Sequence, residues 1–293
     1  MILYKHCPLC NSENLEGYAV DSIRKGPHNS RVRCADCDIV FANPSADFEE
    51  LNAFYRDYYD KGNFGLLNYK QRTIDEIRQV NAHTDAQLKK EASYISDYKT
   101  TGNFLDIGCG LGAGLIYARK LGFKLFGTEL DPDAIGFVNE HFDAAIFHGD
   151  LLAAKYPDEF FDYIFFNHVI EHVLDPKAYI REIVRILKPG GILYIGTPNI
   201  SAPFYRMYRA FRFASFRVPQ IIDGIEHTFL FNKKTLTDIC TTNGLSVIRH
   251  RNLAVGDSLT NIMKSDMSLK KKISRFVQTK FNVNQELICV KER

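Results

Sequence analysis

The chain has 293 residues, 45% of them hydrophobic and 25% charged, which suits one α/β domain of ordinary size and a small appendage. Lys and Arg together number 37 and Asp and Glu 35, so the net charge of +2 argues against a dedicated nucleic-acid binder. No apolar run approaches about 18 residues and the start lacks the order of a signal peptide, so we expect a cytoplasmic protein without a membrane span.

Two pairs of cysteines mark the first 45 residues: Cys7 with Cys10, and Cys34 with Cys37. Each pair has the spacing that lets one tight turn supply two thiolates, and Zn²⁺ takes four such ligands in a tetrahedron. We therefore predict a zinc-ribbon module over residues 1–45. Its zinc ion is expected to be structural, because no coordination position remains open for chemistry. The remaining cysteines are expected in the core: Cys109, Cys240 and Cys289.

Residues 46–98 are predicted to form a helical linker or lid. Ser45-Ala46-Asp47 is typical of a helix cap, and the helix that follows is expected to run past Leu51. A break rich in Tyr, Gly and Asn comes next. A second helix is expected around 70–98, where apolar residues recur at helical spacing: Ile74, Ile77, Val80 and Leu88.

From residue 99 to 293, short apolar runs alternate with helical segments, which predicts βαβ units and a parallel sheet. The expected strands are Phe104–Gly108, Lys124–Leu130, Ala144–Gly149, Tyr163–Phe166, Ile192–Gly196, Ser246–His250 and Glu286–Val290. The expected helices cover 112–121, 131–141, 175–187 and 232–243.

The last two predicted strands lack a helical crossover between them. The predicted fold class is therefore α/β, with a Rossmann-like, seven-stranded, mostly parallel sheet and an antiparallel last strand. Two long stretches, 199–227 and 255–284, are interpreted as insertions at the edge of this sheet. Insertions of that length are often functional.

The first strand of this domain ends in a glycine-rich turn, Asp106-Ile107-Gly108-Cys109-Gly110, and a helix follows. Glycine permits the tight turn and the close approach of a ligand to the backbone. A dinucleotide-binding enzyme could carry the same turn, with Glu129 at the end of the second strand as its ribose-binding acid. Asp106 favours a different cofactor, because a carboxylate there repels a pyrophosphate but suits the ammonium and sulfonium groups of S-adenosylmethionine.

Polar groups also follow the next strands of the predicted sheet. Gly149-Asp150 ends the third strand, and the carboxylate can accept a hydrogen bond from the exocyclic amine of adenine. Asn167-His168 ends the fourth, and Lys188-Pro189-Gly190-Gly191 precedes the fifth. Because the carboxyl ends of parallel strands meet at one edge of a sheet, these groups are expected to face one crevice.

With these motifs in this order, residues 103–250 resemble the class I S-adenosylmethionine-dependent methyltransferases. Within that class they are similar to the ubiquinone-biosynthesis O-methyltransferase group and to sugar methyltransferases that carry a zinc ribbon. The resemblance implies that the glycines pass near the methionine part of the cofactor, that Glu129 holds the ribose diol, and that Asp150 and Leu151 meet the adenine. The cofactor-binding set that it implies is Asp106, Gly108, Gly110, Glu129, Leu130, Asp150, Leu151 and Asn167.

Methyl transfer is an in-line displacement in which the protein positions the acceptor, excludes water and removes a proton where needed. The candidate bases are His227 and His172, with His168 as a third histidine. The segment around His227 is similar to a stretch of the sugar C-methyltransferases, which implies that it acts as base, although Gly224 stands where those enzymes have a partner tyrosine. The competing interpretations are that Glu171 or His172 caps the next helix or holds the cofactor loop, which is the leading interpretation for His168 and Glu171. His227 could likewise cap or pack against the helix after it.

Residues 204–217 interleave four arginines with aromatic residues. Three hypotheses cover this segment: a lid over a phosphate-bearing acceptor, a surface helix packed on the sheet, or a peripheral contact with the cytoplasmic face of a membrane that Lys270–Lys272 would strengthen.

The leading hypothesis for the function is O- or C-methylation of a small molecule, such as a nucleotide- or lipid-linked sugar or another glycan precursor. The alternatives are a quinone or phenol O-methyltransferase, an rRNA or tRNA methyltransferase whose zinc module holds RNA, and a zinc-ribbon interaction protein without activity. The small net charge and the lack of a basic run in residues 1–45 argue against nucleic acid as a partner.

Overall fold

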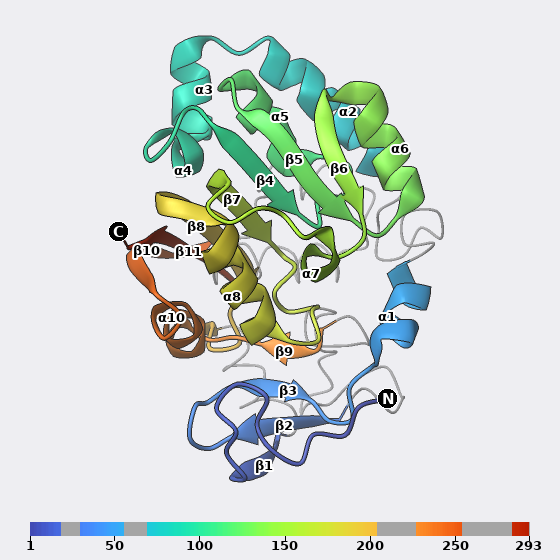
Figure 1. Ribbon diagram of the computed structural model, residues 1–293, viewed down its shortest axis with the longest axis vertical. Coiled ribbons are helices and arrows are strands. Elements are labelled where there is room, and N and C mark those ends of the chain that lie inside the picture. The colour runs from blue at the N-terminus through green and yellow to red at the C-terminus, as the bar shows by residue number, and fades with distance from the viewer. Residues whose placement is uncertain (19–29, 56–68, 204–226, 254–282, 293) are drawn as a thin grey trace.

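The computed structural model describes residues 1–18, 30–55, 69–203, 227–253 and 283–292. These residues form two sheets, one of seven strands and one of four. Figure 1 shows the larger sheet with its helices in the upper part of the molecule and the smaller sheet below it, near the N-terminus. Residues 204–217, Lys270–Lys272 and most of both predicted insertions lie outside the described residues.

The larger sheet has the strand order β10-β11-β8-β7-β4-β5-β6. Strands β6, β5, β4, β7 and β8 are parallel, whereas β11 is antiparallel to both of its neighbours. The predicted α/β fold with an antiparallel last strand is therefore confirmed. The strands are β4 (Asn103–Ile107), β5 (Lys124–Glu129), β6 (Ala144–His148), β7 (Phe161–Asn167), β8 (Leu187–Pro198), β10 (Leu245–Leu253) and β11 (Asn284–Lys291).

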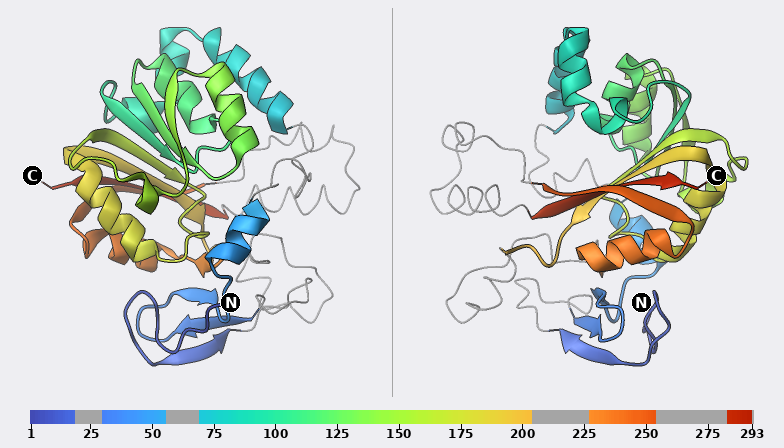
Figure 2. Two further views of the ribbon diagram at one scale, coloured as in Figure 1. Left: turned by 45° about the vertical axis from the view of Figure 1, so that its right-hand side comes forward. Right: turned by 90° about the vertical axis from the view of Figure 1, so that its left-hand side faces the viewer.

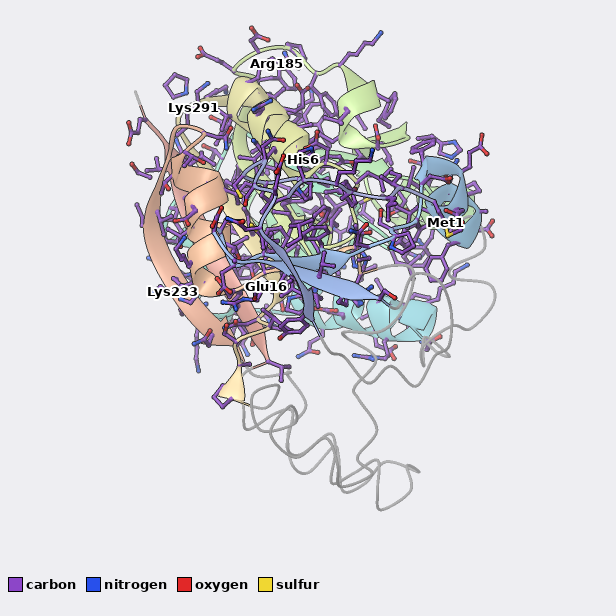
Figure 3. All side chains as sticks on the ribbon, turned by 90° about the horizontal axis from the view of Figure 1, so that it is seen from below. Met1, His6, Glu16, Arg185, Lys233 and Lys291 are labelled. Atoms are coloured by element: carbon purple, nitrogen blue, oxygen red, sulfur yellow. The ribbon has the colours of Figure 1, made fainter. Side chains whose placement is uncertain are left out.

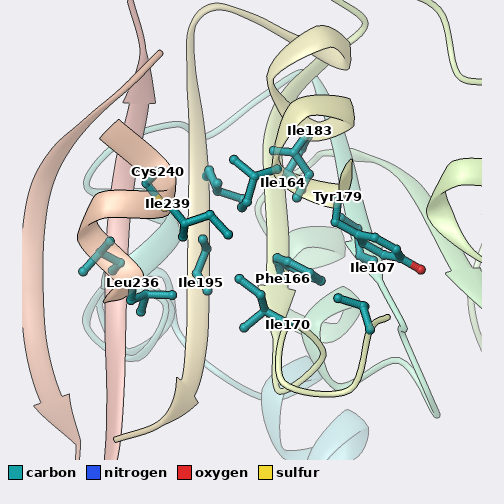
Figure 4. Close-up of a cluster of buried hydrophobic side chains, with 14 of the residues drawn as sticks. Ile107, Ile164, Phe166, Ile170, Tyr179, Ile183, Ile195, Leu236, Ile239 and Cys240 are labelled. Atoms are coloured by element: carbon teal, nitrogen blue, oxygen red, sulfur yellow. The ribbon is translucent and has the colours of Figure 1, made fainter. Parts of the chain in front are cut away.

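Two hydrophobic clusters cover the two faces of this sheet. On one face, α8 and α10 pack against residues such as Ile164, Phe166 and Ile195, as Figure 4 shows. On the other face, α5, α6 and the linker helices pack against Tyr163 and Phe165, which alternate with the first set along β7. Figure 2 shows both layers of helices beside the twisted sheet. The helices are α5 (Ala113–Lys120), α6 (Pro132–His141), α7 (Leu151–Ala154), α8 (Pro176–Ile186) and α10 (Lys233–Thr241).

The described part of the linker contains several short helices: α1 (Phe48–Tyr55), α2 (Tyr69–Asn81), α3 (Asp85–Glu91) and α4 (Ser93–Ser96). The prediction of one continuous helix around 70–98 is wrong, because α2 ends at Asn81 and a new helix, α3, begins at Asp85 with Thr84 as its cap. The Thr84 hydroxyl accepts a hydrogen bond from the Gln87 backbone N–H (3.3 Å), and the Gln87 side chain accepts one from the Thr84 N–H (3.0 Å). This reciprocal cap starts α3 afresh, and Ile77 and Leu88 are buried in the same cluster on either side of the break.

The smaller sheet has the order β1-β2-β3-β9, with all neighbours antiparallel. Three strands come from the N-terminal module: β1 (Leu15–Tyr18), β2 (Arg31–Cys34) and β3 (Val40–Ala42). The fourth, β9 (Phe229–Leu230), comes from the larger domain and was not predicted. Figure 3, seen from below, shows the module in front of the larger domain, between α10 and α1.

Among the described residues, no helix has the length and apolar character needed to cross a membrane.

Candidate active site

A cavity of about 650 Å³ lies at the carboxyl ends of the parallel strands. It coincides with the reversal of strand order between β4 and β7, which is where open α/β sheets bind ligands. Helix α1 of the linker contributes part of the wall through Leu51 and Tyr55. All ten cofactor-binding and catalytic residues predicted from the sequence line this cavity: Asp106, Gly108, Gly110, Glu129, Leu130, Asp150, Leu151, Asn167, His172 and His227.

The turn after β4 requires glycine at two positions. Gly108 has a φ of 66° and Gly110 a φ of 52°, in the left-handed region that side chains disfavour. A Cβ atom on Gly108 would also lie 2.8 Å from the side chain of Val169. The turn therefore keeps its backbone close to the loop after β7, on the wall of the cavity.

Glu129, the last residue of β5, holds this turn in place. Its carboxylate accepts hydrogen bonds from the backbone N–H groups of Gly110 (2.7 Å), Leu130 (2.7 Å) and Asp131 (3.0 Å). Burial raises the pKa of Glu129, and the three backbone hydrogen bonds oppose part of that rise. A carboxylate offers about four acceptor sites, so Glu129 can still accept a hydrogen bond from a ligand.

Asp106 is a buried carboxylate that no Lys, Arg or His of the described residues neutralises. The residue is 4% exposed, and its carboxylate accepts a hydrogen bond from the backbone N–H of Gly114. Burial, followed by the nearby charge of Glu129, raises the pKa of Asp106 well above its usual range. A cationic ligand would offset both effects, so the site suits an ammonium or sulfonium group.

Asp150 and Asn167 lie at the carboxyl ends of their strands, on the cavity wall. Asp150 caps α7, accepting a hydrogen bond from the backbone N–H of Ala153 (2.8 Å). The side-chain oxygen of Asn167 lies so close to Gly196 that a Cβ atom there would be 2.0 Å away from it. Asp150 therefore has a defined position on the cavity wall, and glycine at position 196 leaves the room that the Asn167 side chain occupies.

Glu171 lies at the centre of a cluster of ionisable groups beside the glycine-rich turn that follows β4. Its side chain is 1% exposed, and Thr197 donates a hydrogen bond to it (2.9 Å). The nearest carboxylate oxygen lies 3.2 Å from Nδ1 of His168 and 3.8 Å from Nε2 of His172. Burial raises the pKa of Glu171, but the hydrogen bond and the charges of the neighbouring histidines outweigh burial and lower it to about 2. Glu171 is therefore an anion that favours positive charge on the surrounding imidazoles.

His172 has a partner at each ring nitrogen. Its Nδ1 is 2.9 Å from the hydroxyl of Tyr55, and its Nε2 faces Glu171. A proton on Nε2 would face the carboxylate and leave Nδ1 to accept a hydrogen bond from Tyr55. A chain of polar groups thus connects α1, on the cavity wall, with the buried carboxylate.

The ring of His227 packs against that of His172 in a tilted arrangement, with ring centroids 4.7 Å apart and an interplanar angle of 32°. Burial, followed by the proximity of His172, lowers the pKa of His227 to about 3. The ring is therefore neutral near pH 7 and is a weak proton acceptor. Its Nδ1 is buried and has no hydrogen-bond partner within the described part of the chain.

The helices that follow these histidines are capped by other residues. Asp175 caps α8, and Asn232 caps α10. The interpretation of His168, Glu171 or His227 as helix caps is therefore wrong. In each case the true cap lies several residues further along the chain, which leaves the histidines beside the cavity.

The four cysteines of the N-terminal module converge as their spacing predicts. Their sulfur atoms all lie within 4.8 Å of one another. Cys7 and Cys37 are 3.6 Å apart, and Cys10 and Cys34 are 3.5 Å apart. A disulfide would require about 2.05 Å, whereas thiolates held about 2.3 Å from a tetrahedral zinc ion stand roughly 3.8 Å from each other. The donor set therefore fits zinc.

Three residues of this region escaped the sequence analysis: Tyr55, Thr197 and Arg31. Tyr55 is 117 positions from His172, and no local pattern shows a contact over that separation. Arg31 is 4% exposed and donates a hydrogen bond to the backbone carbonyl of His227 (3.1 Å). Of the three, only Thr197 could have been placed in the site from the sequence, because it lies near the end of a predicted parallel strand.

A family model described as "Methyltransferase domain" matches residues 80–250, which is more than half of the chain. Phosphoethanolamine N-methyltransferase 3 of Arabidopsis thaliana is 32% identical over 136 residues, covering 42% of this chain and 27% of that protein. Norajmaline N-methyltransferase of Rauvolfia serpentina is 30% identical over 158 residues, covering 48% of this chain and 49% of that protein. The chain thus matches half or less of the length of these relatives.

Among solved structures, geranyl diphosphate C-methyltransferase from Streptomyces coelicolor A3(2) is similar with a TM-score of 0.55. The sequence identity is 14%, and the match covers 83% of this chain and 98% of that chain. At this identity the likeness shows a shared fold.

Proposed function

As the chain belongs to the methyltransferase domain family, we propose that it transfers a methyl group from S-adenosylmethionine to a small-molecule acceptor. The observation that carries the proposal is the buried, uncompensated Asp106 beside a left-handed glycine turn, in one cavity with the histidine cluster. A bound cation would offset the burial of that carboxylate, and the cofactor supplies one in its methionine part.

The cofactor would be held by the residues at the strand ends. Asp106 would pair with its ammonium group, and Glu129 would accept hydrogen bonds from the ribose. Asp150 and Leu151 would contact the adenine, and Asn167 would complete the wall. When bound, S-adenosylmethionine supplies an electrophilic methyl carbon on a positively charged sulfur.

We further propose His172 as the base, in preference to His227. A base works best when its pKa is near the working pH, and the pKa of His227, at about 3, is far below it. His172 instead has Tyr55 at one nitrogen and an anionic carboxylate facing the other. In the step itself, the acceptor atom bonds to the methyl carbon while the carbon–sulfur bond breaks. The electron pair of the broken carbon–sulfur bond stays on sulfur. The proton that the acceptor atom loses passes to Nδ1 of His172, directly or through the Tyr55 hydroxyl.

The proposed acceptor is a small molecule, with a sugar or glycan precursor as the leading class. The names of the two N-methyltransferase relatives indicate phosphoethanolamine and norajmaline as their acceptors, which supports a small molecule over RNA. In all of these classes the acceptor atom is an oxygen, nitrogen or carbon that loses a proton, which fits a site built around a base.

We also propose that the four N-terminal cysteines bind one structural zinc ion, on the strength of their spacing and their sulfur–sulfur distances. Four zinc-binding thiols are typical of a reducing compartment, which supports a cytoplasmic location.

A transfer assay with methyl-labelled S-adenosylmethionine tests the function. The wild-type protein should label members of a panel of sugars, nucleotide sugars, amines and phenols, and leave total RNA unlabelled. Labelling of RNA alone would overturn the proposed acceptor class. Failure to bind S-adenosylmethionine at all would overturn the proposed function.

A further inference from the structure

Strand β9 joins the N-terminal module to the histidine side of the cavity. On one edge it pairs with β3, where Phe41 lies opposite Phe229 and the Ala42 N–H donates a hydrogen bond to the Thr228 carbonyl (2.8 Å). On the other edge, the Phe229 N–H donates a hydrogen bond to the carbonyl of Glu171 (3.0 Å). Figure 1 shows β9 between β3 and the larger domain. A displacement of β3 would therefore move the loop that carries Glu171 and His172.

Two polar side chains of the module hold both ends of this segment. Arg31, buried on β2, donates a hydrogen bond to the His227 carbonyl (3.1 Å). Asp38, which directly follows the zinc ligand Cys37, accepts a hydrogen bond from the side chain of Asn232 (2.6 Å). Residues 227–232 are thus fixed to the module at their first and last positions.

The proposed zinc site lies where β2 leads into β3. Cys34 ends β2, and the second cysteine pair forms the turn that leads to β3, closed by a hydrogen bond from the Cys34 N–H to the Ile39 carbonyl (2.9 Å). Cys34 and Ile39 are fully buried in the cluster that also contains Phe41 and Phe229. Because small zinc modules commonly fold only with their metal bound, we expect loss of the ion to release β3.

We propose that zinc binding positions His227 and the Glu171–His172 loop through β3 and β9, so that the module is a working part of the acceptor site. Arg31 is then a positioning residue. The catalytic role of this connection rests on the proposed function, whereas the structural connection between the zinc site and residues 227–232 does not. Asp106 and Glu129 stand on β4 and β5, which belong to the other sheet, so cofactor binding should not depend on the metal.

Hydrogen–deuterium exchange of the full chain tests the link without any acceptor. We compare the zinc-loaded protein, the same protein after chelation, and zinc-loaded Arg31→Met, with Arg181→Met on the exposed face of α8 as the matched control. Residues 227–232 should exchange about tenfold faster after chelation and in Arg31→Met, the effect of losing roughly one net hydrogen bond. The amides of β4–β6, the affinity for S-adenosylhomocysteine and the zinc content of Arg31→Met should not change.

Unchanged exchange of residues 227–232 after chelation of a protein that stays folded would overturn the inference, whatever Arg31→Met shows. If chelation unfolds the whole chain, Arg31→Met decides alone, since it keeps the metal: faster exchange confined to 227–232 supports the link and unchanged exchange refutes it. A protein that shows the link but neither binds S-adenosylmethionine nor transfers a methyl group refutes the proposed function and not the link. With an acceptor in hand, Arg31→Met should raise its KM or lower kcat without changing the KM for S-adenosylmethionine.

Discussion

Replacing Glu171 by glutamine removes the buried charge around which the histidines gather. The pKa of Glu171 is lowered from 4.5 to about 2 in the folded protein, a difference equivalent to about 3 kcal/mol at 1.36 kcal/mol per unit. Because the folded-state pKa lies below the unfolded value, this stabilisation is complete above pH 4.5 and is lost as the pH falls toward 2. Glu171→Gln should therefore lower the free energy of unfolding by about 3 kcal/mol at pH 7 and by much less near pH 3.

The assay is urea unfolding of wild type and Glu171→Gln at both pH values, beside methyl transfer at pH 7. Transfer should fall by roughly 10²–10⁴-fold, because His172 loses the anion that stabilises its protonated form. The matched control is Glu286→Gln, which also removes a buried glutamate (2% exposed) from an ion pair, with Arg251, on β11 outside the cavity. Glu286→Gln should destabilise the protein and leave transfer by the folded enzyme unchanged. An equal loss of stability at pH 7 and pH 3 in Glu171→Gln, or equal transfer in the two variants, would refute the reasoning.

Three further predictions concern the other groups of the two sites. Asp106→Asn should weaken S-adenosylhomocysteine binding by roughly 10- to 100-fold, the loss of one charge-assisted hydrogen bond, in calorimetry. It should also raise the melting temperature of the ligand-free protein at pH 8. The pKa of Asp106 is raised in the folded protein, so the stability that Asp106 contributes is lost as the pH rises through that folded-state pKa. A lower melting temperature of the variant would contradict this prediction. His172→Ala should lower transfer by roughly 10²–10⁴-fold while cofactor affinity holds, and its melting temperature should fall because Glu171 loses one of the charges that lower its pKa. His227→Ala should lower transfer less; the reverse order in turnover assays assigns the base to His227. The double variant Cys7→Ser, Cys10→Ser should lose the one zinc equivalent found in wild type by elemental analysis, and full metal content would exclude these ligands.

The parallel sheet and the cofactor side of the cavity were predictable because both follow from local patterns. Apolar runs ending in Asp106, Glu129 and Asp150 place those carboxylates at one edge once the strands are parallel. The convergence of the four cysteines follows in the same way from two tight turns.

The parts that were missed depend on contacts between distant segments. Strand β9 has two residues, too few to show a period, and it forms only because β3 offers a free edge. Tyr55 reaches His172 through the packing of α1 on the cavity, which no spacing reveals. The break at Thr84 was readable, because Thr84 and Gln87 have capping-box spacing, but the apolar period on both sides concealed it.

The most direct test of the central claim is a calorimetric titration of S-adenosylmethionine into the full chain and into Glu129→Ala. We expect one molecule bound per wild-type chain. We expect an affinity loss of at least 10-fold in the variant, since each ribose hydrogen bond to the carboxylate contributes roughly 1.5–3 kcal/mol. The loss of affinity should be larger still, because the variant also loses the hydrogen bond by which Glu129 holds the backbone N–H of Gly110 in the turn. No binding by the wild type, or equal binding by both proteins, would contradict the assignment of this cavity as the methyl-donor site.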